Sequence, residues 1–462
     1  MLFNSLRFLF FFLPAVYFVF WRLRTRQQRY VWLTLAGYVF YGSWNYKFCA
    51  LMAFSTLVSY GAGLGMLRWQ TPRLRTLCLV LPITVDLLLL GFFKYFNFGL
   101  RTVSAVAGWL HHPVAVHPLA ILLPVGISFY TFHTITYIVD SYRRTITPTR
   151  NFFELACYVC LFPQLVAGPI VRFRQIEGDL ENLGQADRVR DLNRGWSFFA
   201  LGLMKKVLLA DSLAAVLNPA LLGYAHLSTL DTWLCVLGYT YQLYFDFSGY
   251  SDMAVGLGLL FGLRLPQNFD SPYQAVDIAD FWRRWHISLS TCLRDYLYIP
   301  LGGNRQGAGK TYRNLMITML LGGLWHGASW TFVFWGGYHG VLLSLHRLYA
   351  GAWERLHVRL RRAVTFFAVV FGWVFFRATD FSMAAGMLQR MFTPHAGPAL
   401  PGTAGLLVAL AVAIGIAHFA PNTWELEHRW GPAWTGAFAV GYALCLAILA
   451  GGTASPFLYF QF

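Results

Sequence analysis

The sequence predicts an all-α, polytopic membrane protein with about 11–13 membrane helices, counted as apolar runs that reach or approach the length of a bilayer crossing. Of the 462 residues, 57% are hydrophobic and only 12% are charged, whereas soluble domains carry roughly a quarter charged residues. The apolar runs are continuous and do not alternate with polar residues. Helices are therefore favoured over a barrel, since only these two structures satisfy the backbone in lipid.

The runs behind this prediction follow one another along the chain. In order, the clearest are residues 2–21, 30–46, 48–69, 77–98, 119–139, 404–420 and 434–451. Polar connections separate the early runs, among them residues 42–47 and 99–118. Because no polar stretch is long enough for a soluble domain, we expect residues 1–462 to form a single membrane-embedded domain.

Basic residues indicate on which side of the membrane the connections lie. Arginines fill alternate connections, namely Arg22, Arg24, Arg26 and Arg29, then Arg68, Arg73 and Arg75, then Arg143, Arg144 and Arg150, and later Arg347, Arg355, Arg359, Arg361 and Arg362. By the positive-inside rule these connections face the cytoplasm, which places the N-terminus outside. Because the net charge of +16 is dispersed over short connections, we expect lipid and no nucleic acid as a partner.

Polar residues inside apolar runs locate the candidate site, because lipid rejects a charge unless it faces a cavity or a partner. The first such group, within residues 238–256, comprises Gln242, Asp246, Ser248, Ser251 and Asp252. The step from Ser248 to Gly249 predicts a broken helix that lines a water-filled cavity. Asp246, Ser248 and Asp252 are then candidate substrate-binding residues. The alternative is a pair of structural carboxylates bonded to nearby backbone or arginines.

The second group lies in residues 280–303, DFWRRWHISLSTCLRDYLYIPLGG. As one helix, this segment would align two tryptophans and two leucines in a stripe, which is typical of an interfacial helix at headgroup depth. Its candidate substrate-binding residues are Trp282, Arg283, Arg284, Trp285, Asp295 and Tyr296. His286, in the middle, is a candidate catalytic residue, with a structural role as the alternative.

The third group surrounds His326 in LLGGLWHGASWTFVFWGGYHG. Basic residues flank this segment, so it should enter the membrane and return, with His326 about twelve residues, or ~18 Å, from the cytoplasmic edge. Gly322, Gly323 and Gly327 permit close helix packing or a turn. An imidazole at this depth is inexpensive to hold neutral, which makes His326 a candidate catalytic residue and Trp325 a candidate substrate-binding neighbour. A satisfied core histidine is the alternative.

Missing motifs disfavour two enzyme classes. The chain has no G-x-S-x-G elbow and no H-E-x-x-H pair, so we expect neither a serine hydrolase nor a zinc peptidase, and no metal site. The C-x-x-C of Cys157 and Cys160 lies in an apolar run and is interpreted as core. Lys205 and Lys206, near segment ends, are expected to snorkel.

Six blocks of sequence carry a family resemblance. They are LPVGISFYTFHTITYIVDSYR at residues 123–143, FPQLVAGPIVRF at 162–173, YFDFSGYSDMAVGLG at 244–258, NFDSPYQAVDIADFWRRWHISLSTCLRDYLYIPLGGNR at 268–305, the block around His326, and FLYFQF at 457–462. Through these blocks the chain resembles the membrane-bound O-acyltransferases, in the branch of bacterial alginate O-acetylation membrane proteins.

The resemblance implies helices around a buried tunnel that donor and acceptor approach from opposite sides, with His326 catalytic and His286 a second important polar residue. It implies a bacterial inner-membrane enzyme that moves acetyl from a cytoplasmic thioester toward an exopolysaccharide hydroxyl. The donor would be acetyl-CoA, with no bound cofactor, and a periplasmic acetyl-carrying or polysaccharide-modifying protein would be the partner. Arg283, Arg284 and Arg305 are candidates to attract the donor's phosphates.

Other functions remain open from the sequence. The same fold could transfer D-alanyl groups, or acylate peptidoglycan. A transporter or flippase is the alternative from another class, and it predicts inverted repeats and a coupling-ion site. The sequence displays neither feature.

Overall fold

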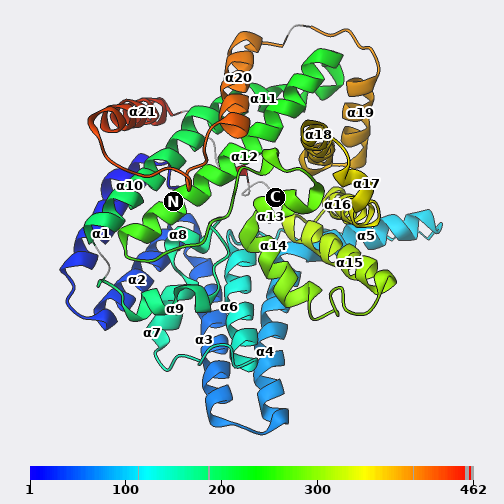
Figure 1. Ribbon diagram of the computed structural model, residues 1–462. Coiled ribbons are helices and arrows are strands. Elements are labelled where there is room, and N and C mark those ends of the chain that lie inside the picture. The colour runs from blue at the N-terminus through cyan, green and yellow to red at the C-terminus, as the bar shows by residue number, and fades with distance from the viewer. Residues whose placement is uncertain (113, 186–187, 399, 453–456, 459–462) are drawn as a thin grey trace. The chain divides into compact units, whose positions relative to one another are not determined.

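The computed structural model describes residues 1–462 except 113, 186–187, 399, 453–456 and 459–462. Throughout the described residues the regular elements are helices, without a strand (Figure 1), which confirms the predicted all-helical class. The described chain divides into two compact units, the first formed by Met1–Phe3, Arg7–Gly195 and Leu257–Pro266, the second by Asn4–Leu6, Trp196–Gly256 and Gln267–Phe462. The single functional domain stays a prediction.

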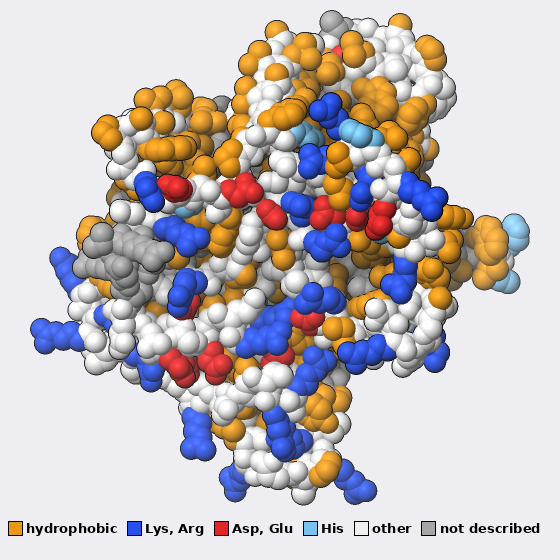
Figure 2. Space-filling view, viewed as in Figure 1, with side chains coloured by type: hydrophobic (Ala, Val, Ile, Leu, Met, Phe, Trp, Pro, Cys, Tyr) orange, Lys and Arg blue, Asp and Glu red, His pale blue; other side chains and the backbone are white. Residues whose placement is uncertain are grey.

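The first unit contains the helices α1 to α9. Their bounds are α1 Leu13–Arg22, α2 Arg26–Asn45, α3 Lys47–Arg68, α4 Pro72–Leu90, α5 Phe96–Trp109, α6 Ile127–Tyr142, α7 Phe152–Val159, α8 Phe162–Leu165 and α9 Phe173–Glu181, with π-helical stretches at Phe8–Phe12 and Gly91–Tyr95. Helices α3, α4 and α6 pack side by side (Figure 1). Figure 2 shows Lys and Arg side chains gathered around the turn between α3 and α4.

Two predicted boundaries in this unit are wrong. The expected connection 99–118 is helical as far as Trp109, because the π-helical stretch after α4 continues directly into α5. The expected run 119–139 becomes helical only at Ile127. The reason is local: Pro124 has no N–H to donate, and Gly126 takes a left-handed conformation with φ of 76° just before α6 begins.

The second unit contains most of α10 and the helices that follow. Their bounds are α10 Arg188–Met204, α11 Ser212–Leu222, α12 Thr229–Leu260, α13 Ile278–Arg284, α14 Ile287–Leu293, α15 Ala308–His326, α16 Trp330–Leu348, α17 Ala350–Glu354, α18 Val358–Arg377, α19 Phe381–Phe392, α20 Thr403–Phe419 and α21 Pro432–Ala450, with α12 ending in the first unit. Lys205–Asp211 and Arg294–Tyr298 are π-helical, and Tyr224–His226 and Pro272–Gln274 are 3₁₀ turns.

Several helices have the length and apolar character of membrane spans. Among the described residues, Lys47–Arg68, Pro72–Trp109 and Pro432–Ala450 meet both criteria, and Phe8–Arg22 and Thr403–Phe419 are shorter apolar helices. These helices support the predicted membrane class. The count of 11–13 and the orientation of the N-terminus stay predictions.

Helix α12 contradicts the predicted break at Ser248 and Gly249. It runs through 32 residues without interruption. Gly249 serves packing there, because a Cβ at this position would lie 2.7 Å from the carbonyl oxygen of Gly202 on α10. The glycine therefore lets two helix backbones touch, and α12 crosses the second unit as a continuous, largely buried helix.

Candidate active site

His326 lies at the tip of a helical hairpin. It is the last residue of α15, and after three residues Ser329 caps α16 by accepting a hydrogen bond from the N–H of Thr331 at 3.3 Å. Figure 1 shows α15 and α16 side by side, as expected for a segment that enters and returns. A Cβ on Gly323 would overlap the carbonyl oxygen of Phe332 and lie 3.0 Å from Gly336. The hairpin is therefore held by backbone contact, as the glycine pattern predicted.

Aromatic rings from three helices surround the His326 imidazole, which is 4% exposed. Its ring centroid lies 5.0 Å from that of Trp325, 5.2 Å from Trp335 and 5.3 Å from Phe376. The second predicted catalytic residue, His286, lies nearby, and its ring centroid is 6.4 Å from that of His326. The fold thus brings together two histidines that are 40 positions apart in the sequence.

His286 occupies the turn between α13 and α14, where it is fully buried. Its φ of 44° is left-handed, which is uncommon for a residue other than glycine and typical of constrained functional positions. Asn268 fixes this turn, since its carbonyl oxygen accepts from the N–H of Ile287 at 2.9 Å and its side-chain oxygen accepts from the N–H of Ser288 at 3.2 Å. Burial lowers the pKa of His286 to about 3, so the ring is neutral at physiological pH.

The predicted interfacial helix over residues 280–303 is wrong. The left-handed turn at His286 separates α13 from α14, so the tryptophans do not lie along one exposed stripe. Trp285 is buried, with its ring 4.9 Å from Trp373 and 5.0 Å from Phe269. Trp282 is half-buried and contacts Trp335 at 5.8 Å. These two candidate substrate-binding residues therefore belong to the aromatic cluster around the histidines.

The charged candidates of this segment lie nearer the surface. Arg283 is exposed and lies 3.4 Å from Asp280, which also receives a hydrogen bond from Arg284 at 3.1 Å. Asp295 pairs with the neighbouring Arg294 at 2.7 Å, and Tyr296 follows on the same π-helical stretch, half-buried. Arg305 is exposed in a turn that contains the positive-φ glycines 302, 303 and 307.

The two predicted acidic residues of α12, Asp246 and Asp252, are engaged in ion pairs. Asp246 lies 2.6 Å from Lys206 and accepts from the N–H of Leu458 at 2.9 Å. Asp252 lies 2.6 Å from Lys205 and accepts from Thr423 at 2.7 Å. The structural alternative accounts for these contacts, with lysines in place of the expected arginines.

Ser248, between the two acids, is buried, and its role in substrate binding stays a prediction. The expectation that Lys205 and Lys206 snorkel is wrong, because both ammonium groups turn inward to carboxylates. Of the terminal block FLYFQF, which contributes to the family resemblance, Phe457 and Leu458 are buried, and residues 459–462 lie outside the described residues.

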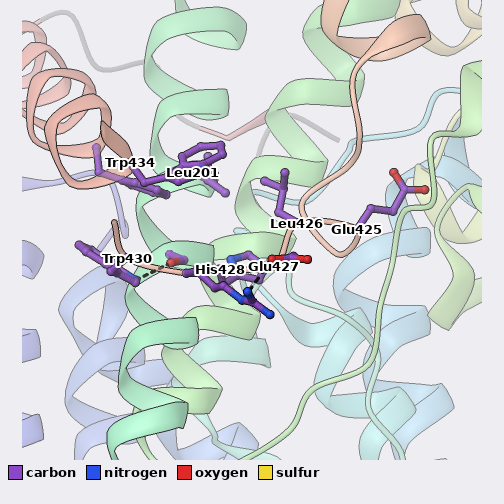
Figure 3. A pocket seen from close by; sticks show the side chains of 10 residues that line it. Leu201, Glu425, Leu426, Glu427, His428, Trp430 and Trp434 are labelled. Carbon is purple, nitrogen blue, oxygen red and sulfur yellow. Dashed lines mark hydrogen bonds and ion pairs between the residues drawn. The ribbon is translucent and has the colours of Figure 1, made fainter. Parts of the chain in front are cut away.

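Two cavities lie elsewhere in the second unit. One of about 850 Å³ is largely apolar, lined by α10 and α20 with Lys205 and Thr423. Another of about 300 Å³ lies between α10 and the connection from α20 to α21; Figure 3 shows Trp430 and Trp434 on one side of it and Glu425 on the other. Neither predicted catalytic histidine lines either cavity.

Sequence reasoning missed Asn268, although it begins the longest of the quoted blocks. It also missed Trp373 and Phe376 on α18, whose apolar run gave no sign of contact with the histidines. Within the described part of the chain, no cluster of three or more His, Cys, Asp or Glu residues could hold a metal ion.

Comparison with known proteins places these residues in context. Residues 124–385 match the model of the membrane-bound O-acyltransferase family. The probable alginate O-acetylase AlgI of Pseudomonas aeruginosa is 45% identical over 85% of this chain and 75% of its own length. The peptidoglycan O-acetyltransferase of Helicobacter pylori is 38% identical over 85% of this chain and 80% of its own. The teichoic acid D-alanyltransferase of Bacillus subtilis is 27% identical over 60% of this chain and 75% of its own.

Proposed function

The chain belongs to the membrane-bound O-acyltransferase family, and from this premise we propose that it moves acetyl from a cytoplasmic thioester toward a polysaccharide hydroxyl outside the bacterial inner membrane. As a member of this family it is a membrane acyltransferase related to O-acetyltransferases. The donor, the acceptor and the catalytic roles below are the proposal.

One observation carries the proposed site. His326 is buried at the tip of the α15–α16 hairpin, with a second buried histidine 6.4 Å away and aromatic rings on its other sides. Such a setting excludes bulk water from a reactive thioester. An unprotonated imidazole there could accept a proton. The alternative of a core histidine does not explain why the fold brings a second buried histidine next to His326.

In the proposed reaction, His326 acts as general base. It takes the proton of an acceptor hydroxyl as the oxygen attacks the thioester carbonyl, forming a C–O bond and a tetrahedral oxyanion. The intermediate then collapses with cleavage of the C–S bond, and the proton on His326 passes to the departing thiolate. The products are an ester and a free thiol, and general-base catalysis of this kind contributes roughly 10²–10⁴-fold.

We propose acetyl-CoA as the donor. Its phosphates would be attracted by arginines on the cytoplasmic side, with Arg283, Arg284 and Arg305 as the candidates. Arg283 and Arg305 are exposed, so they are accessible to a soluble donor. The acetyl arm would then extend past Trp282 and Trp285 toward His326, with Trp325 beside the reacting group.

We propose an alginate-type exopolysaccharide as the acceptor, supported by 45% identity to alginate O-acetylases, with a periplasmic protein that completes delivery. Peptidoglycan is the second candidate, because the Helicobacter pylori relative covers the same share of the chain at 38% identity. D-alanyl transfer is favoured less, since that relative covers only 60% of the chain.

The test is His326→Ala in the native host, with secreted polymer quantified and its ester-bound acetate measured. We expect a normal amount of polymer with little or no acetate. A matched control is His112→Ala, which alters an exposed histidine. Loss of the polymer itself would favour transport of acyl or glycan intermediates, and full acetylation would contradict the proposed base.

A further inference from the structure

The hydrogen bonds of Asn268 determine which nitrogen of His286 carries the proton. The side-chain oxygen of buried Asn268 lies 3.2 Å from the backbone nitrogen of Ser288, 2.8 Å from the Ser288 hydroxyl and 3.1 Å from Nδ1 of His286. Its side-chain nitrogen donates to the hydroxyl of Ser251 at 3.1 Å.

This arrangement leaves a single consistent assignment. A backbone N–H can only donate, so the Asn268 atom facing Ser288 must be the amide oxygen. An amide oxygen can only accept, so Nδ1 of His286 must carry a hydrogen. A neutral imidazole has one ring proton, which leaves Nε2 of His286 with a free lone pair. Nε2 is buried and has no hydrogen-bond partner among the described residues.

We propose that Asn268 is a positioning residue that holds His286 in the Nδ1–H tautomer, so that His286 offers the site a hydrogen-bond acceptor at Nε2. It follows that His286 does not donate to a developing oxyanion, and that another group must do so. The catalytic meaning of this acceptor rests on the proposed function, whereas the tautomer itself does not.

The distance between the histidine rings shows what this acceptor could bind. With ring centroids 6.4 Å apart, the nearest ring nitrogens are separated by about 4 Å or more, beyond the roughly 3 Å of a direct hydrogen bond. The two rings therefore do not hydrogen-bond each other directly, and Nε2 of His286 remains available to an O–H group in the site.

Asn268 also maintains the backbone on which this geometry depends. His286 is left-handed, with φ of 44° and ψ of 53°, and Asn268 bonds the two residues that follow it. Ser251 on α12 anchors the other end of the amide. One side chain therefore links α12, the left-handed turn and the ring of His286.

The direct test is solid-state ¹⁵N NMR of the full-length protein, labelled with ¹⁵N-histidine and reconstituted in lipid bilayers. The His286 signals are identified by their loss in His286→Gln. We expect a protonated Nδ1 and an unprotonated Nε2 at neutral pH. The same pattern is expected in Asn268→Asp, which keeps an acceptor oxygen, and not in Asn268→Leu. A protonated Nε2 in the unaltered protein would overturn the proposal.

A second measurement separates positioning from a merely structural role. In Asn268→Asp the new carboxylate favours the imidazolium form of His286, so the pH at which its ¹⁵N signals report a second ring proton should rise. Ser251→Ala removes only the distant partner of the amide and should leave both this titration and the tautomer unchanged. A lower melting temperature with an unmoved titration would refute the positioning role.

The two proposals fail in different ways. If the unaltered protein transferred no acetyl group to polymer, the proposed function would be wrong, yet the NMR pattern would still decide the tautomer. If acetyl transfer were normal and His286 carried its proton on Nε2, only the role of Asn268 would be lost.

Discussion

The ammonium group of Lys206 lies 2.6 Å from the carboxylate of Asp246, with both side chains buried. The same ammonium group lies 2.6 Å from Asp211, so one lysine compensates two acids. Lys206→Met would leave these carboxylates without their counter-ion, which typically costs about 3–5 kcal/mol. We expect a large fall in melting temperature or a loss of monodisperse protein in detergent, measured by fluorescence-detected size exclusion.

The control for this charge deletion is Lys310→Met, since Lys310 is exposed and bonds only the side chain of Gln306 in the described structure. Adding Asp246→Asn to Lys206→Met should recover part of the lost stability. A Lys206→Met protein as stable as the unaltered one would show that the buried ion pair is not required for the fold.

Gly336→Ala should destabilise the hairpin that carries His326. Its Cβ would overlap the carbonyl oxygen of Met319 and lie 3.2 Å from Gly323, and overpacking of this kind costs about 1–3 kcal/mol. The melting temperature and the rate of acetyl transfer should both fall. Gly351→Ala is the matched control, because nothing lies within 4 Å of its added Cβ. Equal behaviour of the two variants would be inconsistent with backbone contact.

His286→Asn separates chemistry from conformation. Asparagine tolerates the left-handed backbone of this position, so the turn should be retained. Acetyl transfer should nevertheless fall sharply, because the imidazole is lost. Melting temperature and ester-bound acetate are the measurements. A fully active His286→Asn protein would assign this residue a structural role alone.

Arg283→Ala should weaken the binding of the acetyl-CoA donor without lowering the stability of the fold. The Arg283 side chain is 65% exposed and its pairing with Asp280 is long, at 3.4 Å, so little folding energy depends on this pair. We expect a higher KM for acetyl-CoA, with a difference from the unaltered protein that shrinks as salt rises. Arg101→Ala, on a segment that the charge pattern places outside, is the control. An unchanged KM at low salt would remove Arg283 from the donor site.

The local sequence pattern was sufficient to predict the structure of segments whose conformation depends on their own residues. Flanking charges and glycines around His326 predicted a hairpin, and α15 and α16 form one because Gly323 and Gly336 permit contact at short range. The continuous apolar runs likewise predicted α3, α20 and α21 to within a few residues.

Prediction from the sequence failed where the local conformation depends on contact with a residue far away in the chain. A positive φ is uncommon for any residue other than glycine, so the turn at His286 could not be foreseen without Asn268, which lies 18 positions earlier. Local sequence rules predicted a helix break at Gly249. The glycine instead allows the helix to pack against the carbonyl of Gly202 without interruption. Lys206 was expected to snorkel, because the sequence did not reveal that Asp246, one of its two carboxylate partners, comes from α12.

The close contact between α15 and α16 has a consequence for biogenesis. Two helices joined by three residues and touching along their backbones can enter the bilayer together as one preassembled unit. His326 would then travel at the leading end of that unit, followed on both sides by apolar turns. If the hairpin inserts in this way, its insertion would also carry the proposed base into the bilayer.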